Sequence, residues 1–432
     1  MNQYQMQYQS KMGNLEDAYK LLNDGDLIAC AYCANAPATF LSSLSTRREK
    51  RRNLKLLYSL GLETYDFLSD RSMLDFVTPY SYFLMGPSRK SYEKGILQFI
   101  PSHLHSGVTR QDQLRQADVF VAAVTPMDQH GYFRCSLSNI GEKIWLNGAR
   151  KVILEVNSNL PVVYGDNEIH ISDVDCIIES ERPVPTLDKG ALTAEDIKIG
   201  EHVATLVNDG DTIQLGIGSI PDAVAQAFME KRDLGVHTEM ITNSIVDLVE
   251  QGVVTGKRKS LHPGKIVGTF ALGNQRLYDF MHHNPSVLLL PGDYVNNPFV
   301  VAQNDNMVSI NTSFGVDFTG QVSSEAIGPV QYSGTGGQSD TAFGAIHARN
   351  GRSVIALKST VKGGTISSIQ PVFSQGSIVT LSRNNVDYIV TEYGIANLKD
   401  KCLNDRAKAL IGIAHPKFRD ELTEAAKQMR YL

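Results

Sequence analysis

The sequence predicts an α/β protein built from two similar open α/β domains with largely parallel sheets. Short apolar runs of the kind found in buried parallel strands alternate with helical stretches along the 432-residue chain. The turn sequence Asn-Asp-Gly-Asp occurs at 23–26 and again at 208–211, each time after a helical stretch and before an apolar strand. A chain of this length also exceeds one ordinary core, so the repeated pattern favours a duplicated domain.

A change in composition indicates where the two domains meet. Residues 179–195 contain Pro183, Pro185 and Gly190 among charges of both signs, which is typical of a linker. We therefore expect an N-terminal α/β domain at 1–185 and a C-terminal α/β domain at 186–432.

The composition fits a globular enzyme, with 42% hydrophobic and 20% charged residues. A net charge of −5 provides no bulk basic field, so we expect no nucleic-acid partner. The N-terminus is polar, and the sequence has no apolar run of about 18 residues, so we expect no membrane partner. These features together predict a cytoplasmic protein.

Two pairs of residues could suggest a metal or redox site. Cys30 and Cys33 lie in an apolar, strand-like run with no second cysteine pair, which is typical of buried thiols. His103 and His105 have no carboxylate or cysteine at ligand spacing. We therefore predict no metal site and no disulfide framework.

The most informative stretch is 206–240. Its pattern predicts a strand at 212–215, a glycine loop at Gly216–Gly218, a helix with Pro221 in its first turn, and a second strand that ends at Glu239. A helix that begins behind a glycine turn presents free N–H groups and a positive dipole end, which suit an anion.

A dinucleotide site is one interpretation of this stretch. Gly216-x-Gly218 follows a strand, and Glu239 lies roughly 20 residues further on. Against it, Pro221 occupies the third glycine position, and Glu239 is followed by what resembles a loop and a new helix. The alternative is that Glu239 itself takes part in the chemistry.

A second glycine cluster, Ser333-Gly-Thr-Gly336-Gly337, follows almost 100 residues later. Such loops converge at the carboxyl ends of parallel strands. The combination makes sense if backbone N–H groups stabilise an oxyanion beside a carboxylate nucleophile. Taken singly, each cluster is explained equally well by a tight turn.

Several motifs in register resemble the acetyl-CoA hydrolase/transferase family, in particular the branch of 4-hydroxybutyrate and butyrate CoA-transferases. The resemblance covers nearly the whole chain, and a set of motifs in this order is far more specific than any one of them. They lie at 165–172, 214–223, 237–240, 261–265, 302–311, 333–338, 359–364 and 391–396.

The resemblance implies a role for each matching position. Glu239 matches the nucleophile that becomes a glutamyl-CoA thioester, and Gly336 and Gly337 belong to the loop that provides an oxyanion N–H. The positions implied to bind CoA are Gln214, Leu215, Gly216, Ile217, Gly218, Ser333, Gly337 and Lys362.

The resemblance also implies an activity, the transfer of CoA between a short-chain acyl-CoA and a carboxylate such as acetate. CoA and acyl-CoA would be substrates, with no tightly bound cofactor, and the protein would be a homodimer or a dimer of dimers. An acyl-CoA hydrolase using the same glutamate and a non-catalytic CoA-binding protein are the alternatives. Thr242-Asn243-Ser244 replaces the Ser-Asp-Gly of close relatives, so the preferred acyl group is not carried over.

Overall fold

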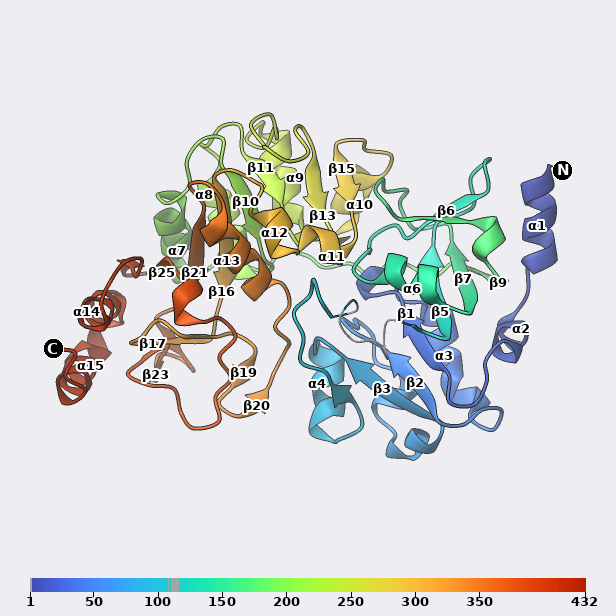
Figure 1. Ribbon diagram of the computed structural model, residues 1–432, viewed down its shortest axis with the longest axis horizontal. Helices are drawn as coiled ribbons and strands as arrows, with labels where there is room; N and C mark the ends of the chain where they lie inside the picture. The colour runs from blue at the N-terminus through green and yellow to red at the C-terminus, as the bar shows by residue number, and fades with distance from the viewer. Residues whose placement is uncertain (1, 108, 110–115) are drawn as a thin grey trace. The chain divides into compact units, whose positions relative to one another are not determined.

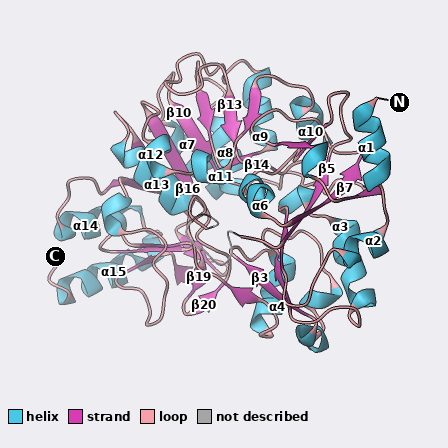
Figure 2. Cartoon of the chain, turned by 45° about the vertical axis from the view of Figure 1, so that its right-hand side comes forward, coloured by secondary structure: helices cyan, strands magenta, loops and turns pink. Residues whose placement is uncertain are grey.

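The computed structural model describes residues 2–107, 109 and 116–432. The chain divides into two compact units, the first comprising Met1–Leu187 with Gly268–Tyr294 and the second Asp188–Val267 with Val295–Leu432. Each unit contains a sheet of mainly parallel strands accompanied by helices (Figures 1 and 2). This confirms the predicted α/β class. The division differs from the expected boundary after residue 185 in that 268–294 group with the first unit.

The first unit has a seven-stranded sheet in the order β4-β3-β2-β1-β5-β7-β9. Every adjacent pair runs parallel, and β5 is buried along its whole length, as its apolar sequence predicts. The strands are β1 (Leu27–Cys30), β2 (Leu54–Leu57), β3 (Val77–Ser81), β4 (Gln98–Phe99), β5 (Val119–Val124), β7 (Lys151–Asn157) and β9 (Cys176–Ser180). The helices include α1 (Gln3–Lys11), α2 (Leu15–Lys20), α3 (Ala38–Ser43), α4 (Gly86–Glu93), α6 (Glu142–Gly148) and α10 (Gln275–Met281).

Within the second unit the sheet follows the order β13-β11-β10-β16-β21-β25-β26. The strands pair in parallel except for the β25–β26 hairpin. They are β10 (Thr212–Leu215), β11 (Gly235–His237), β13 (Ile266–Gly268), β16 (Met307–Thr312), β21 (Arg352–Ala356), β25 (Tyr388–Thr391) and β26 (Gly394–Asn397). The helices are α7 (Ala194–Ala204), α8 (Ser219–Ala227), α9 (Asn243–Glu250), α12 (Pro298–Val301), α13 (Gln338–His347), α14 (Leu403–Ile413) and α15 (Pro416–Gln428).

The two Asn-Asp-Gly-Asp turns adopt the same geometry in the two units. The carboxylate of Asp26 accepts a hydrogen bond from the backbone N–H of Asn23 at 2.7 Å. Asp211 accepts the equivalent bond from Asn208, also at 2.7 Å. Each bond closes the turn immediately before the central strand, β1 in one unit and β10 in the other.

Each of these aspartates also pairs with an arginine at the start of the next strand but one. Asp26 pairs with Arg150, which precedes β7, and Asp211 pairs with Arg352, which begins β21, both at 2.8 Å. The intervening strands are β5 and β16. The ion pairs therefore fasten the amino ends of corresponding strands in the two sheets.

A third shared contact lies one strand further along. Asp175 accepts from the N–H of Val152 at 2.9 Å, and Asp387 accepts from that of Ser353 at 3.0 Å. The first bond joins the start of β9 to β7, and the second joins the start of β25 to β21. Because three carboxylate contacts recur in the same strand positions, the structure supports the duplication that the repeated turn predicts.

We expect Asp211→Ala to lower the free energy of unfolding by about 3 kcal/mol, because it leaves the largely buried Arg352 guanidinium without its partner. Asp26→Ala is the matched control. Its partner Arg150 is 42% exposed, so water replaces the lost pair and the loss is smaller. Urea denaturation followed by circular dichroism measures both. Equal losses would contradict the role given to burial.

Candidate functional site

Glu239 follows the short strand β11 and directly precedes β12 (Met240–Ile241). Its side chain is half-buried, and its carboxylate accepts a hydrogen bond from the side-chain amide of Asn296, with 3.0 Å between Nδ2 and Oε2. The backbone N–H of Gly337 also donates to it. Thr238 fixes the approach from β11, because its N–H donates to Val267 and its hydroxyl to the carbonyl of Leu215. The carboxylate is therefore held in place from three sides.

The glycine at 337 is required by this close approach. A Cβ atom there would lie 2.0 Å from Glu239 Oε2 and 2.0 Å from Asn296 Nδ2, so any side chain would displace the carboxylate. Gly337 is the N-cap residue of α13, and Gly336 before it has a φ of +55°, which favours glycine. The structure thus places the second glycine cluster beside Glu239.

Burial raises the pKa of Glu239 from its usual value to about 7. The nearby Asp340 carboxylate raises the pKa further, whereas the Asn296 amide and the Gly337 N–H lower it by stabilising the charged form. At neutral pH the residue is poised between acid and carboxylate. A carboxyl group with a pKa shifted in this way is typical of a residue that reacts.

Ser333 is buried in the same loop, and its own N–H donates to the carbonyl of Glu325. The Glu325 carboxylate accepts from the hydroxyl of Thr335 and from the side-chain amide of Gln331. This buried glutamate therefore orders the segment that leads to Gly337. Sequence analysis did not single out Glu325 or Asn296, because neither belongs to a glycine motif.

The predicted loop at 214–218 has two parts with different surroundings. The side chain of Gln214 is buried, and its carbonyl oxygen accepts from the Ser309 hydroxyl and the Ile310 N–H. The Thr341 hydroxyl lies 3.4 Å from the same oxygen and donates to the carbonyl of Gly337, so Gln214 belongs to the framework beneath the glycine cluster.

The second part of this loop is open to solvent. Leu215 is buried in β10, but Ile217 is 47% exposed. Gly216 separates these two residues, and Gly218 has a φ of +118° at the N-cap of α8. No side chain caps this helix, because its N-cap residue is Gly218, and the neighbouring Ser219 hydroxyl donates to Asp196. The first turn of α8 therefore keeps N–H groups that can bind an anion.

A surface pocket within the second unit joins this loop to Lys362. Lys358 in the same pocket pairs with Asp196, whereas Lys362 lies exposed in the turn between β22 (Thr360–Val361) and β23 (Ile366–Ser367). The predicted residues thus form two groups, Glu239 with the second glycine cluster and the first glycine loop with Lys362. The pocket is lined by Ile217, Gly218, Ser219, Ile220, Pro221, Thr312, Ser313, Phe314, Lys358, Thr360, Val361, Lys362, Gly363, Gly364 and Ser368.

Comparisons with known proteins place the chain in a family. Residues 1–188 match the acetyl-CoA hydrolase/transferase N-terminal domain, and residues 273–426 match the acetyl-CoA hydrolase/transferase C-terminal domain. The chain belongs to the acetyl-CoA hydrolase/transferase family. This confirms the family that the motifs predict.

Individual members of the family are similar over their whole length. The chain is 40% identical to a succinyl-CoA:cyclohexane-1-carboxylate CoA transferase of Geobacter metallireducens, over 99% of this chain and 97% of the relative. It is also 40% identical to a 4-hydroxybutyrate coenzyme A transferase of Clostridium kluyveri, over 98% of each chain. The crystal structure of RipA from Yersinia pestis matches 100% of both chains with a TM-score of 0.92 and 35% identity.

Thr242-Asn243-Ser244 lies at the start of α9. All three residues are buried, and the Ser244 hydroxyl donates to the Asp222 carboxylate of α8. The segment therefore lies where α8 and α9 pack together.

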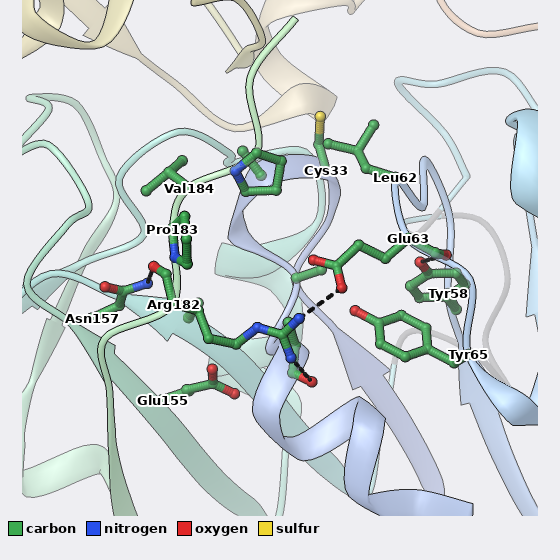
Figure 3. Close-up of a pocket in the computed structure, with 15 residues that line it drawn as sticks. Cys33, Tyr58, Leu62, Glu63, Tyr65, Glu155, Asn157, Arg182, Pro183 and Val184 are labelled. Carbon is green, nitrogen blue, oxygen red and sulfur yellow. Dashed lines mark hydrogen bonds and ion pairs between the residues drawn. The ribbon is translucent and has the colours of Figure 1, made fainter. Parts of the chain in front are cut away.

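A second pocket lies within the first unit, near the carboxyl ends of β1 and β7 (Figure 3). Figure 3 shows the Arg182 guanidinium facing the Glu63 carboxylate, and they pair at 2.9 Å. Glu155 accepts hydrogen bonds from the N–H groups of Thr39 and Phe40 at the start of α3. The charged groups of this pocket are thus engaged with the protein itself.

Cys33 lines the same pocket and is a free, buried thiol, as is Cys30. Burial raises the pKa of Cys33 to about 12, so it is unreactive at neutral pH, as predicted for a buried thiol. Within the described ranges, no group of three or more His, Cys, Asp or Glu side chains is arranged to hold a metal ion. Nor does any described helix have the length and apolarity needed to cross a membrane.

We expect Glu239→Gln to stabilise the protein at pH 8 by on the order of 3 kcal/mol. The folded protein binds the Glu239 proton more tightly than the unfolded chain does, since burial raises the pKa from 4.5 to about 7. Stability is therefore lost as the pH rises from about 4.5 to about 7, and glutamine removes this loss.

The measurement is the thermal midpoint of both proteins between pH 4 and pH 8. The two midpoints should converge at the acidic end, where Glu239 is protonated in both states. Glu230→Gln, which changes an exposed glutamate of the same unit, is the control and should show no such divergence. A gap that does not vary with pH would refute the burial argument.

Proposed function

We propose that this protein is a CoA-transferase that moves CoA between a short-chain acyl-CoA and a carboxylate such as acetate. The acyl groups considered are 4-hydroxybutyryl, butyryl and acetyl. The observation that carries the proposal is the half-buried Glu239 carboxylate, held against the Gly337 N–H and the Asn296 amide. The printed names of its relatives, among them the 4-hydroxybutyrate coenzyme A transferase, support the same reaction class.

The first step forms an anhydride. A carboxylate oxygen of Glu239 attacks the thioester carbonyl of the acyl-CoA, and the carbon–sulfur bond then breaks to release CoA thiolate. N–H groups of the glycine cluster stabilise the oxyanion between these events, and loss of one such donor typically costs about 2.7–4 kcal/mol. Because Gly337 already contacts Glu239, the donor is in place when the nucleophile reacts.

The second step transfers CoA to the enzyme. The bound thiolate attacks the Glu239 carbonyl of the anhydride, which releases the free acid and leaves a glutamyl-CoA thioester. A second carboxylate then reverses both steps and leaves as a new acyl-CoA. The thioester energy is conserved throughout, so no ATP is consumed, and the kinetics are ping-pong.

The exposed pocket of the second unit supplies binding energy for CoA. The first turn of α8 and the Lys362 ammonium suit the phosphates, and Ile217 and Val361 offer apolar surface to the pantetheine arm. Interactions with this remote part of CoA lower the barrier at the reacting carbon. The buried Gln214 and Ser333 would act by ordering the loops. CoA is a substrate here, and the proposal includes no tightly held cofactor.

We also propose the partners, the oligomeric state and the location of the protein. Its partners are acyl-CoA and carboxylate substrates, and its assembly is a homodimer or a dimer of dimers, as the family resemblance implies. Its location is the cytoplasm. Size-exclusion chromatography with light scattering tests the assembly.

We expect incubation with butyryl-CoA alone to label Glu239 with CoA, because no acceptor carboxylate is present to complete the cycle. Mass spectrometry of the digested protein locates the label. Glu239→Ala should transfer no CoA, and Glu239→Gln should recover slowly if its amide hydrolyses. A label on another residue, or none, would rule out the mechanism.

The same assay separates transfer from hydrolysis. Adding acetate to a transferase yields acetyl-CoA with little free CoA, whereas a hydrolase releases free CoA at the same rate with or without acetate.

We expect the rate of enzyme labelling to rise with pH through about 7, because only the carboxylate form of Glu239 is a nucleophile. Below this pH the rate should fall about tenfold per unit. Asn296→Ala should shift the rise to higher pH, since the Asn296 amide lowers the pKa of Glu239. Stopped-flow single-turnover kinetics from pH 5 to 9 measure both. An Asn296→Ala profile that coincides with that of the wild type would contradict this role.

A further inference from the structure

A lysine that the proposed mechanism does not use is buried beside the strand that leads to Glu239. Lys259 is 4% exposed, in the segment between α9 and β13. Its ammonium donates to the carbonyl of Val236 at 2.7 Å and to that of Lys265 at 2.8 Å. Burial lowers the pKa of Lys259 to about 7. Burying an ammonium is costly, so its place in the structure calls for an explanation.

The contacts of Lys259 tie two neighbouring strands together. Val236 is the middle residue of β11, and Lys265 immediately precedes β13, which pairs with β11 in parallel. The lysine stem packs over Gly235, where a Cβ atom would lie 2.3 Å from Lys259 Cγ. The ammonium therefore anchors the backbone three residues before Glu239.

The next residue of β11, His237, makes a second hydrogen bond to a neighbouring segment. His237 is buried, and its Nε2 donates to the carbonyl of Val295 at 2.8 Å. Burial, with the nearby Lys259 charge, lowers the pKa of His237 to about 3, so the ring is neutral. Val295 directly precedes Asn296, which donates to Glu239. The hydrogen bond from His237 to Val295 therefore holds the strand that leads to Glu239 against the segment that contains Asn296.

We propose that Lys259 is a positioning residue for Glu239. Together with His237 it fixes β11 at two consecutive residues, so that the Glu239 carboxylate meets the Asn296 amide and the Gly337 N–H. The inference rests on the proposed function. Displacing a reacting group by about 1 Å can cost about 100-fold in rate, so loosening this strand acts on the chemical step.

The test is Lys259→Met, which keeps an unbranched apolar stem and removes the ammonium. We expect kcat to fall about 10- to 100-fold while the KM for butyryl-CoA stays within about twofold, because the CoA pocket is untouched. Lys259→Arg keeps N–H donors for the two carbonyls and should recover part of kcat. Lys257→Met, an exposed lysine of the same segment, is the control and should leave kcat and KM unchanged.

The wild-type protein is assayed first, so that the two ideas fail separately. If the wild-type protein transfers no CoA, the proposed function is wrong. An active wild type with an unchanged kcat in folded Lys259→Met overturns the positioning role. So does a parallel change of kcat and KM that tracks a lowered thermal midpoint, because such a change indicates general loosening.

A second pair of variants keeps the test open if Lys259→Met does not fold. His237→Gln retains an N–H donor for the Val295 carbonyl, whereas His237→Leu lacks one. We expect kcat of the glutamine variant to exceed that of the leucine variant at least about fivefold, with similar KM. Equal kcat values would overturn the proposal.

Discussion

The half-buried Glu239 carboxylate receives hydrogen bonds from the Asn296 amide and the Gly337 N–H. Burial destabilises the charge, and these two donors partly offset that cost, so the pKa stays near neutrality. The close approach of the carboxylate requires glycine at 337, and Glu325 orders the loop that leads there. A carboxylate held in this way lowers the stability of the fold, which is a cost that functional sites commonly carry.

The sheets supply the rigidity that this arrangement needs. In each unit, carboxylates at the amino ends of the strands close a turn and bind an arginine or a backbone N–H of a nearby strand. The opposite ends of the strands are left to carry loops. In the second unit those loops include residues 216–218, which connect β10 to α8, and the residues after β11 that reach Glu239. Fastening one edge leaves the other available for chemistry.

Much of this could be predicted from sequence because it depends on local pattern. The repeated turn at 23–26 and 208–211 predicted two related units. The expected position of both glycine loops at strand ends predicted that they would meet at Glu239, and Gly337 lies against its carboxylate. Asn296, Glu325 and Lys259 were missed, because each acts through a contact between segments far apart in the chain. The grouping of 268–294 with the first unit was missed for the same reason. Gln214 was expected in a CoA loop, yet its amide serves the framework beneath Gly337.

The peptide at Gly337 belongs to the site and also starts α13. Its N–H faces Glu239 while its carbonyl accepts hydrogen bonds from the N–H and the hydroxyl of Thr341, one turn along. One residue therefore fixes both the first turn of α13 and a contact of the Glu239 carboxylate. A substitution that unwinds this turn, even on the far side of the helix, would be expected to disturb the Glu239 contact as well.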